Sequence, residues 1–244
     1  RNDSARTHHF MAQNGILQSS LAKKYAMAAT GLFLCLFLVG HLAGNLQLLT
    51  AASDGGRQFN EYAKFMTTFP AVKLLSYLTY FSVLFHLVDG VVLSLQNRKA
   101  RPVRYAMERA SSNAGWSSRN MMLLGTIVLV FLVTHMQNFW WQMHFGEVAM
   151  IDYDGESVKD LYTVVAAFFN PEMNRWALPA IGLYLLGQFA LGFHLWHGFS
   201  SGFQSVGLRH PRYTTIISCL GKAFSVLVPV LFSAIVVFMY ITQA

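Results

Sequence analysis

The chain has 244 residues, 54% of them hydrophobic and only 12% charged, and its formal net charge is +7 at pH 7. A soluble domain carries about 25% charged residues, so this composition excludes an ordinary soluble domain and indicates a membrane protein. The positive charge does not indicate nucleic-acid binding, because basic and acidic stretches alternate along the chain. We expect membrane lipid, and no nucleic acid, as its surroundings.

Five long apolar stretches predict five transmembrane helices, at residues 25–50, 72–96, 120–144, 176–206 and 214–242. Each exceeds the roughly 20 residues that cross about 30 Å of hydrocarbon, and a helix satisfies all of its backbone groups there. The first stretch is too long for the apolar region of a signal peptide, and no small-residue cleavage site follows it. The sequence therefore predicts an all-α membrane bundle that forms a single domain over residues 1–244.

The charged residues predict how this bundle is oriented. Thirteen of the 18 Lys and Arg fall in three stretches, and eight of the 11 Asp and Glu fall in the two loops between them. The positive-inside rule makes the basic stretches cytoplasmic, with the N-terminus inside and the C-terminus outside. In the second acidic loop, at 146–175, a short interfacial helix is predicted at 158–169.

Four histidines, His41, His86, His135 and His194, each lie in a different predicted helix. Such side chains are costly to insert into a bilayer and mark function. Four imidazoles are the number that holds two haem irons by both axial positions, and such an iron suits electron transfer better than oxygen chemistry. The alternative is four unrelated histidines that each make an interhelical hydrogen bond.

The depth of the histidines favours two pairs. His41 and His135 lie 16 and 15 residues from the cytoplasmic ends of their helices, which is roughly 22–24 Å at about 1.5 Å per residue. His86 and His194 lie 10 and 12 residues from those ends, which is roughly 15–18 Å. One pair is therefore expected nearer the cytoplasm and the other nearer the outside.

The sequence around these histidines resembles a known family. The run TGLFL at 30–34, then VGH at 39–41 and the stretch HLAGNLQLL, is similar to the first membrane helix of the cytochrome b anchor of succinate:quinone oxidoreductases, the succinate dehydrogenases and quinol:fumarate reductases. HLVDG at His86 and HLWHG at His194 share a glycine four residues after the histidine, as in that family's haem-ligand helices. The resemblance covers nearly the whole chain and is to the five-helix, two-haem type.

This resemblance implies two haem b groups and their ligands. His86 and His194 would bind the proximal haem, and His41 and His135 the distal haem. His197 is an alternative ligand or a partner of a haem propionate, and the position of Gly198 favours His194. Further propionate candidates are led by Arg119 and include Ser19, Ser20, Arg98, Ser201 and Ser205, while quinone candidates are led by Asn45 and include Gln47, Tyr62 and His144. Asp89 is expected to be hydrogen-bonded, protonated or part of a proton path, and His8, His9 and His210 are expected to be bystanders.

The resemblance also implies partners and a location. The two cysteines, Cys35 and Cys219, lie in separate apolar stretches, and the sequence has no dinucleotide-binding motif. The chain therefore lacks the thiolate cluster that an iron–sulfur centre needs. A flavoprotein subunit with FAD and an iron–sulfur subunit are expected on the cytoplasmic face, with the dicarboxylate chemistry on those subunits. Quinone, often menaquinone in the two-haem type, is expected as substrate in a bacterial cytoplasmic membrane, and a higher oligomer of the complex is left open.

Other functions are left open by the residues alone. The chain is also compatible with the cytochrome b of a hydrogenase or a formate dehydrogenase. The cytochrome b of the bc-type complex places two ligands about 14 residues apart on one helix, and no helix here has such a pair. From other classes, a transporter or a haem-free membrane anchor are the remaining interpretations.

Overall fold

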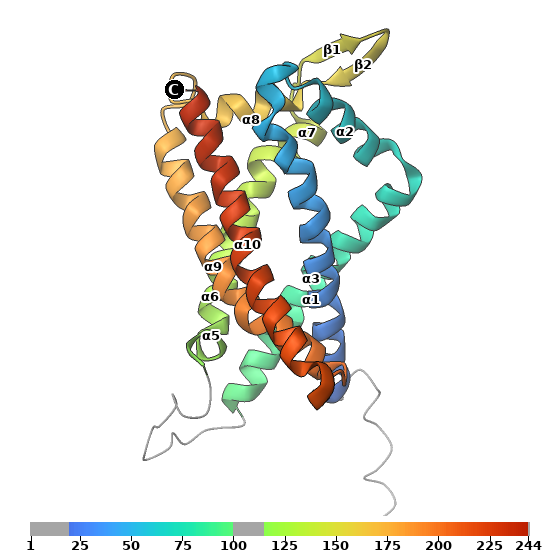
Figure 1. Cartoon of the computed structure of the whole chain (residues 1–244), viewed down its shortest axis with the longest axis vertical. Helices are drawn as coiled ribbons and strands as arrows, with labels where there is room; N and C mark the ends of the chain where they lie inside the picture. Colours follow the sequence, from blue (N-terminus) through green and yellow to red (C-terminus); the bar gives the residue numbers. More distant parts are fainter. Residues whose placement is uncertain (1–19, 100–114, 244) are drawn as a thin grey trace, which may run out of the picture.

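The structure is a computed structural model that describes residues 20–99 and 115–243 (Figure 1). Its five long helices are α1 (Ser20–Asn45), α3 (Pro70–Lys99), α6 (Met121–His135), α9 (Ala177–Ser205) and α10 (Pro211–Gln243). All five, α1 and α6 together with the short helical segments that continue them, are long and apolar enough to cross a membrane. The prediction of an all-α, multi-pass membrane bundle is confirmed.

The helix ends differ from the prediction by a few residues. The first helix begins at Ser20 rather than at residue 25, and so includes Lys23 and Lys24. A long lysine side chain near the end of a span can place its charge at the membrane surface. A helix can therefore extend beyond the apolar stretch that predicts it. The last helix begins at Pro211, a residue that suits a first helical position because its missing N–H has no helical partner there.

The third span is not one regular helix. α6 ends at His135, and a π-helical segment, η4 (Met136–Trp141), continues the span to the short helix α7 (Gln142–Phe145). A π-helical turn changes the direction in which the following side chains point, and such turns are frequent at functional sites. The sequence does not predict this change of winding.

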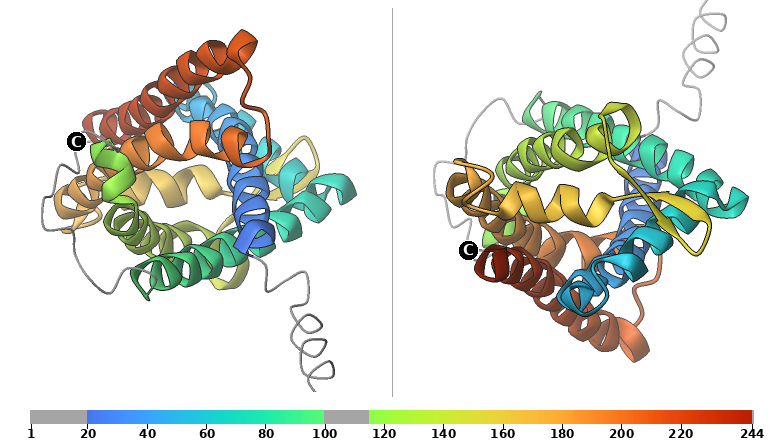
Figure 2. Two further views of the ribbon diagram at one scale, coloured as in Figure 1. Left: turned by 90° about the horizontal axis from the view of Figure 1, so that it is seen from below. Right: turned by 90° about the horizontal axis from the view of Figure 1, so that it is seen from above.

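Four of the long helices form a ring in the order α1, α3, α6, α9, and α10 lies outside this ring (Figure 2). α9 packs against both α6 and α1, and α10 packs chiefly against α9. Two diagonals therefore cross the ring: one joins α1 to α6, and the other joins α3 to α9. Side chains that point inward from diagonally opposed helices face one another across the interior.

The tightly packed core lies to one side of this ring. Its buried cluster includes Leu42, Leu48, Tyr184, Val236 and Met239, from α1, η2 (Leu46–Leu49), α9 and α10. In contrast, the buried side chains of α3 are the polar Thr79, Ser82 and Asp89. The bundle is thus held mainly by α9 and α10, with α3 attached at the other side.

A small extramembrane cap covers one end of the bundle, called the capped end (Figure 1). It contains α2 (Arg57–Thr68), the antiparallel hairpin of β1 (Met150–Tyr153) and β2 (Glu156–Lys159), and α8 (Leu161–Phe169). The predicted interfacial helix at 158–169 is correct from residue 161. It is wrong at its start, because Val158 pairs with Ile151 in the hairpin and Asp160 caps α8 by accepting a hydrogen bond from the Thr163 N–H at 3.1 Å.

The buried Asn60 joins the parts of the cap. Its Nδ2 donates to Asp160 Oδ1 at 3.1 Å and to the Tyr153 hydroxyl at 3.3 Å, and its Oδ1 accepts from the Tyr162 N–H at 2.8 Å. α2 is thereby tied to both the hairpin and α8. A buried side chain that satisfies three partners is costly to remove.

Ion pairs on the surface add to this link. Arg57 donates to Glu61 at 2.8 Å and to Asp154 at 2.6 Å. These hydrogen bonds to Asp154 and Glu61 raise the pKa of Arg57 further above its ordinary value.

The two ends of the bundle differ in charge. Eight of the nine described acidic residues lie at the capped end, in α2, the hairpin and the connecting loops. The opposite end, called the basic end, carries described lysines and arginines at Lys23, Lys24, Arg98, Lys99, Arg119, Arg209, Arg212 and Lys222. The ninth described acid, Asp89, is buried within α3.

Candidate functional site

Two histidines face each other near the capped end. His41 comes from α1 and His135 from the last residue of α6, so the pair lies on one diagonal of the ring. Their ring centroids are 5.8 Å apart with an interplanar angle of 83°. This pair is called the capped-end pair below.

Two more histidines face each other nearer the basic end. His86 comes from α3 and His194 from α9, which is the other diagonal of the ring. Their ring centroids are 6.3 Å apart with an interplanar angle of 66°. His86 and His194, which were predicted to lie at one depth, are therefore neighbours in the structure, and this pair is called the basic-end pair. His41 and His135, predicted to lie at the other depth, are neighbours as well.

The spacing of both pairs fits a metal held between two imidazoles. A metal–imidazole bond is about 2 Å long, so two rings on opposite sides of one metal have centroids roughly 6 Å apart. The hydrogen bonds described for these rings involve Nδ1 of His86 and of His41. Each pair brings together two imidazoles, a donor set that can hold a metal such as haem iron.

The second ring nitrogen of one histidine in each pair has a neighbour on the same or the adjacent helix. His86 Nδ1 lies 3.3 Å from Thr30 Oγ1, which itself donates to the Ala26 carbonyl and so can accept from the ring. His41 Nδ1 lies 3.4 Å from Asn45 Nδ2. The Thr30 hydroxyl can accept from Nδ1–H and so fix the orientation of a ligating His86 imidazole and tune its basicity, whereas the Asn45 amide nitrogen is only a donor.

The other histidine of each pair has no such neighbour. Nδ1 of His135 and Nδ1 of His194 are buried and have no hydrogen-bond partner within the described residues. An unpartnered buried nitrogen is costly in a structure that has no other use for the ring. It argues against the interpretation that all four histidines serve as ordinary interhelical hydrogen bonders.

Glycines on neighbouring helices make room for the basic-end pair. A Cβ atom on Gly31 of α1 would lie 3.1 Å from His86 Cε1, and one on Gly125 of α6 would lie 3.6 Å from His194 Cε1. At Gly198, one turn after His194, a Cβ atom would meet nothing within 4 Å. The backbone beside this pair is therefore open on one side, which suits the close approach of a flat ring.

Aromatic side chains enclose the capped-end pair. His41 stacks on Phe37 at 5.3 Å and contacts Phe232 at 5.5 Å. His135 contacts Phe131, Phe139 and Tyr184 at 5.6, 5.4 and 5.9 Å. Such walls keep water and charge away from whatever the pair holds.

The surroundings of the basic-end pair are more polar. Asp89 lies one turn after His86, is buried, and has one carboxylate oxygen, Oδ2, without a hydrogen-bond partner. Both Lys23 and His86 are close enough to interact with it electrostatically. His197 lies one turn after His194 but does not face His86; it lines a polar pocket together with Ser201.

The remaining predicted residues are dispersed. Asn45 contacts His41 and donates to the His41 carbonyl at 2.8 Å, and Tyr62 lies against Gly44. His144 is exposed and stacks on Trp140 at 4.3 Å, and Trp140 donates to the Tyr80 hydroxyl at 2.8 Å. Gln47 Oε1 is buried without a partner among the described residues. Three residues are exposed: Arg98, Arg119 at the end of α5 (Trp116–Arg119), and His210 just before α10. Ser205 is the last residue of α9, and Ser19, His8 and His9 lie outside the described residues.

Sequence reasoning missed the role of Thr30 and named only Ser201 among the serines that line the polar pocket. Thr30 was noted only as part of a motif, and its spacing gives no sign that it reaches His86 on another helix. The serines at 117–118 and 200–201 are visible in the sequence as pairs at the ends of apolar stretches, which is a signal that they share a surface.

Comparisons with known protein families, curated proteins and solved structures find no match to this chain.

Proposed function

We propose that this chain is the dihaem cytochrome b anchor of a succinate:quinone oxidoreductase, either a succinate dehydrogenase or a fumarate reductase, in a bacterial cytoplasmic membrane. In this role it carries electrons between an iron–sulfur subunit and membrane quinone. The observation that carries the proposal is the meeting of four transmembrane histidines as two facing pairs, on the two diagonals of one helix ring.

The residues present fit two haem b groups. His41 and His135 would hold one iron, and His86 and His194 the other. Bound haem supplies a one-electron iron couple. Two imidazoles for each iron would suit electron transfer rather than oxygen chemistry, and the aromatic side chains around His41 and His135 would keep water away from that pair.

The charge of the two ends supports the proposed partners. The basic end is the side expected in the cytoplasm, where the flavoprotein subunit with FAD and the iron–sulfur subunit would dock. Among the described residues no group of three or more His, Cys, Asp or Glu is placed to hold a metal ion, and the two cysteines lie on α1 and α10. We assign the flavin and iron–sulfur centres to partners, and dicarboxylate chemistry with them, because the resemblance implies those subunits.

The stretches around His41, His86 and His194 support the family assignment by their resemblance to that family's ligand helices. The capped-end pair would lie near the outer face, and the proposed quinone, menaquinone in this assignment, would react close to it. Asn45 and His144 are the described polar residues of that region that we keep as quinone candidates.

The test is a reduced-minus-oxidised absorption spectrum of the purified complex with a haem-to-chain ratio. The proposal expects a haem b signal, two haems for each chain, and reduction of that signal by succinate. Reduction by formate or hydrogen, but not by succinate, would assign the chain to another quinone-linked dehydrogenase. The absence of any haem b signal would refute electron transfer by this chain.

A further inference from the structure

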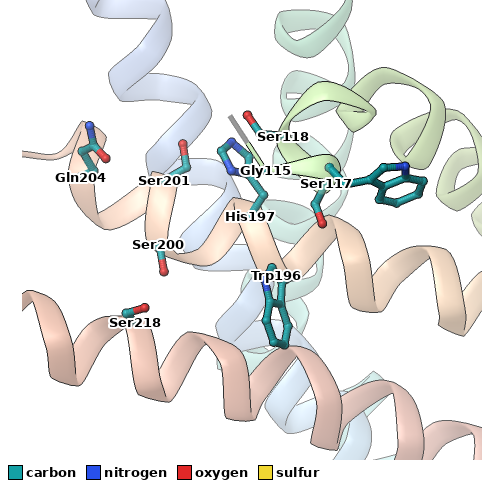
Figure 3. Close-up of a pocket in the computed structure, with 10 residues that line it drawn as sticks. Gly115, Ser117, Ser118, Trp196, His197, Ser200, Ser201, Gln204 and Ser218 are labelled. Atoms are coloured by element: carbon teal, nitrogen blue, oxygen red, sulfur yellow. The ribbon is translucent and has the colours of Figure 1, made fainter. Parts of the chain in front are cut away.

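A polar pocket lies at the basic end between α5, α9 and α10, outside the ring of histidine pairs (Figure 3). Its volume is about 340 Å³. Side chains from the three helices surround one space, and the hydroxyl-bearing ones are Ser117, Ser118, Ser200, Ser201 and Ser218. His197 and Gln204 add an imidazole and an amide to the lining.

The hydroxyls of these five serines differ from those of most other helical serines and threonines in the chain. Ser76, Thr126 and Ser233, for example, donate to the backbone carbonyl four residues earlier, at 2.8–3.0 Å. None of the five pocket serines makes a side-chain hydrogen bond to a described residue. Ser117 is only 7% exposed and still lacks one. Hydroxyls that do not bond to the carbonyl one turn earlier stay available to another partner, and these five line one pocket.

The charge around the pocket selects an anionic partner. The Lys222 ammonium lies over the Trp196 ring at 5.8 Å from its centroid, beside the pocket, and Arg119 ends the helix that supplies Ser117. No acidic side chain is among the residues that line the pocket. Hydroxyls, an amide and an imidazole beside a fixed cation are donors suited to the oxygens of a phosphate or carboxylate.

The depth of the pocket selects a lipid. Trp116, which lines it just before the third span, is 50% exposed, and an exposed tryptophan at the end of a span lies at the level of the lipid headgroups; Trp196, 45% exposed, lies nine residues before the end of α9 and so deeper. Ser117 and Ser118 come just before the third span, Ser200 and Ser201 lie in the last turns of α9, and Ser218 lies early in α10. The donors therefore lie where the phosphate of a membrane lipid is found.

We propose that this pocket binds the headgroup phosphate of an anionic phospholipid. The hydroxyls donate to the phosphate oxygens, Trp116 and Trp196 border the acyl chains, and Lys222 supplies the charge that prefers an anionic lipid over a zwitterionic one. This proposal does not depend on the proposed function, because it uses none of the four histidines of the two pairs.

The test is native mass spectrometry of the full chain, with any subunits that purify with it, in detergent with added phosphatidylglycerol or phosphatidylcholine. The double variant S200A/S218A removes two free hydroxyls, and the matched control S76A/S233A removes two hydroxyls that bond to their own helix. We expect S200A/S218A to retain phosphatidylglycerol at least about tenfold less than the unmodified chain, since the loss of one hydrogen bond to a charged group already weakens binding by about tenfold or more. The control should retain it unchanged.

Three outcomes would overturn the proposal. One is equal retention of phosphatidylglycerol by S200A/S218A and by its control. Another is displacement of phosphatidylglycerol by millimolar inorganic phosphate, which would assign the pocket to a soluble anion. The last is a loss of haem, or a changed haem potential, in S200A/S218A, which would assign the hydroxyls to haem carboxylates. A chain found to contain no haem would refute the proposed function and leave the lipid result standing.

Discussion

The capped-end and basic-end histidine pairs are alike in geometry and unlike in surroundings. Both join diagonally opposed helices, with ring centroids 5.8 and 6.3 Å apart. The capped-end pair is surrounded by Phe and Tyr rings beneath the extramembrane cap, whereas the basic-end pair has Asp89 beside it and His197 one turn away.

This comparison separates what sets the distance between the two imidazoles of a pair from what would tune the potential of a metal bound there. The diagonals of the ring set the distance between the imidazoles, which is why both pairs offer the same donor set. Burial, hydrogen bonding and nearby charge tune the potential of a bound metal, and these differ between the pairs. Two chemically equal sites in one bundle can therefore have unequal potentials.

The largest expected effect comes from removing one histidine of a pair. His135→Ala should remove one of two haems and leave the other, and His194→Ala should do the same at the other site, because each iron would lose an axial ligand. The haem-to-chain ratio and the reduced-minus-oxidised spectrum measure this. His144→Ala, an exposed histidine in the same span as His135, is the control and should keep both haems. Loss of both haems, or of neither, would contradict the pairing.

The cap gives a test of how the capped-end pair is protected. Asn60→Ala leaves the Tyr162 N–H and the Asp160 carboxylate without their buried partner, and should destabilise the cap by roughly 1–3 kcal/mol. Faster hydrogen exchange in the hairpin and α8 measures this, with no change around the basic-end pair. Gln58→Ala, exposed on the same helix, is the control. Equal exchange in the two variants would show that Asn60 does not hold the cap.

The charge beside the basic-end pair gives a smaller, directional effect. The carboxyl of Asp89, at a pH where it is ionised, would stabilise the more positive, oxidised iron, so Asp89→Asn should raise the potential of one haem at that pH by about 20–60 mV, or ~0.5–1.4 kcal/mol. A redox titration should show the shift in one couple only. Glu172→Gln, exposed at the capped end, should shift neither. A shift in the potential of the other couple, or a fall in potential, would contradict the placement of the Asp89 charge beside the basic-end pair.

The smallest effect is expected at Arg57. Its pairs with Glu61 and Asp154 lie on the surface, where water and salt screen charges. Arg57→Ala should lower the thermal midpoint of the cap far less than Asn60→Ala does. The lowering caused by Arg57→Ala should become smaller still in high salt. Thermal unfolding at low and high salt measures both, and an effect as large as that of Asn60→Ala would mean that the cap depends on its surface charges.

Parts of the candidate site are readable in the sequence. The four histidines stand out because each is isolated in an apolar stretch, and counting residues from the helix ends is enough to sort them by depth. Asn60 and Thr30 do not stand out, because their partners lie 56 to 102 residues away. The pocket serines are visible only as pairs, and the sequence does not show that three helices bring them to one pocket. The hairpin was missed because it is short and follows no long apolar pattern.

The sequence by itself determined the five spans and the levels of the four histidines, because crossing a bilayer depends on the composition of about 20 consecutive residues and depth follows from a fixed rise per residue. Only the tertiary structure decided that α1 faces α6 and α3 faces α9, that the third span turns π-helical after His135, and that free serines gather between α5, α9 and α10. Those features arise from packing between segments that are distant in the chain, and a local sequence pattern does not specify which helices pack against each other.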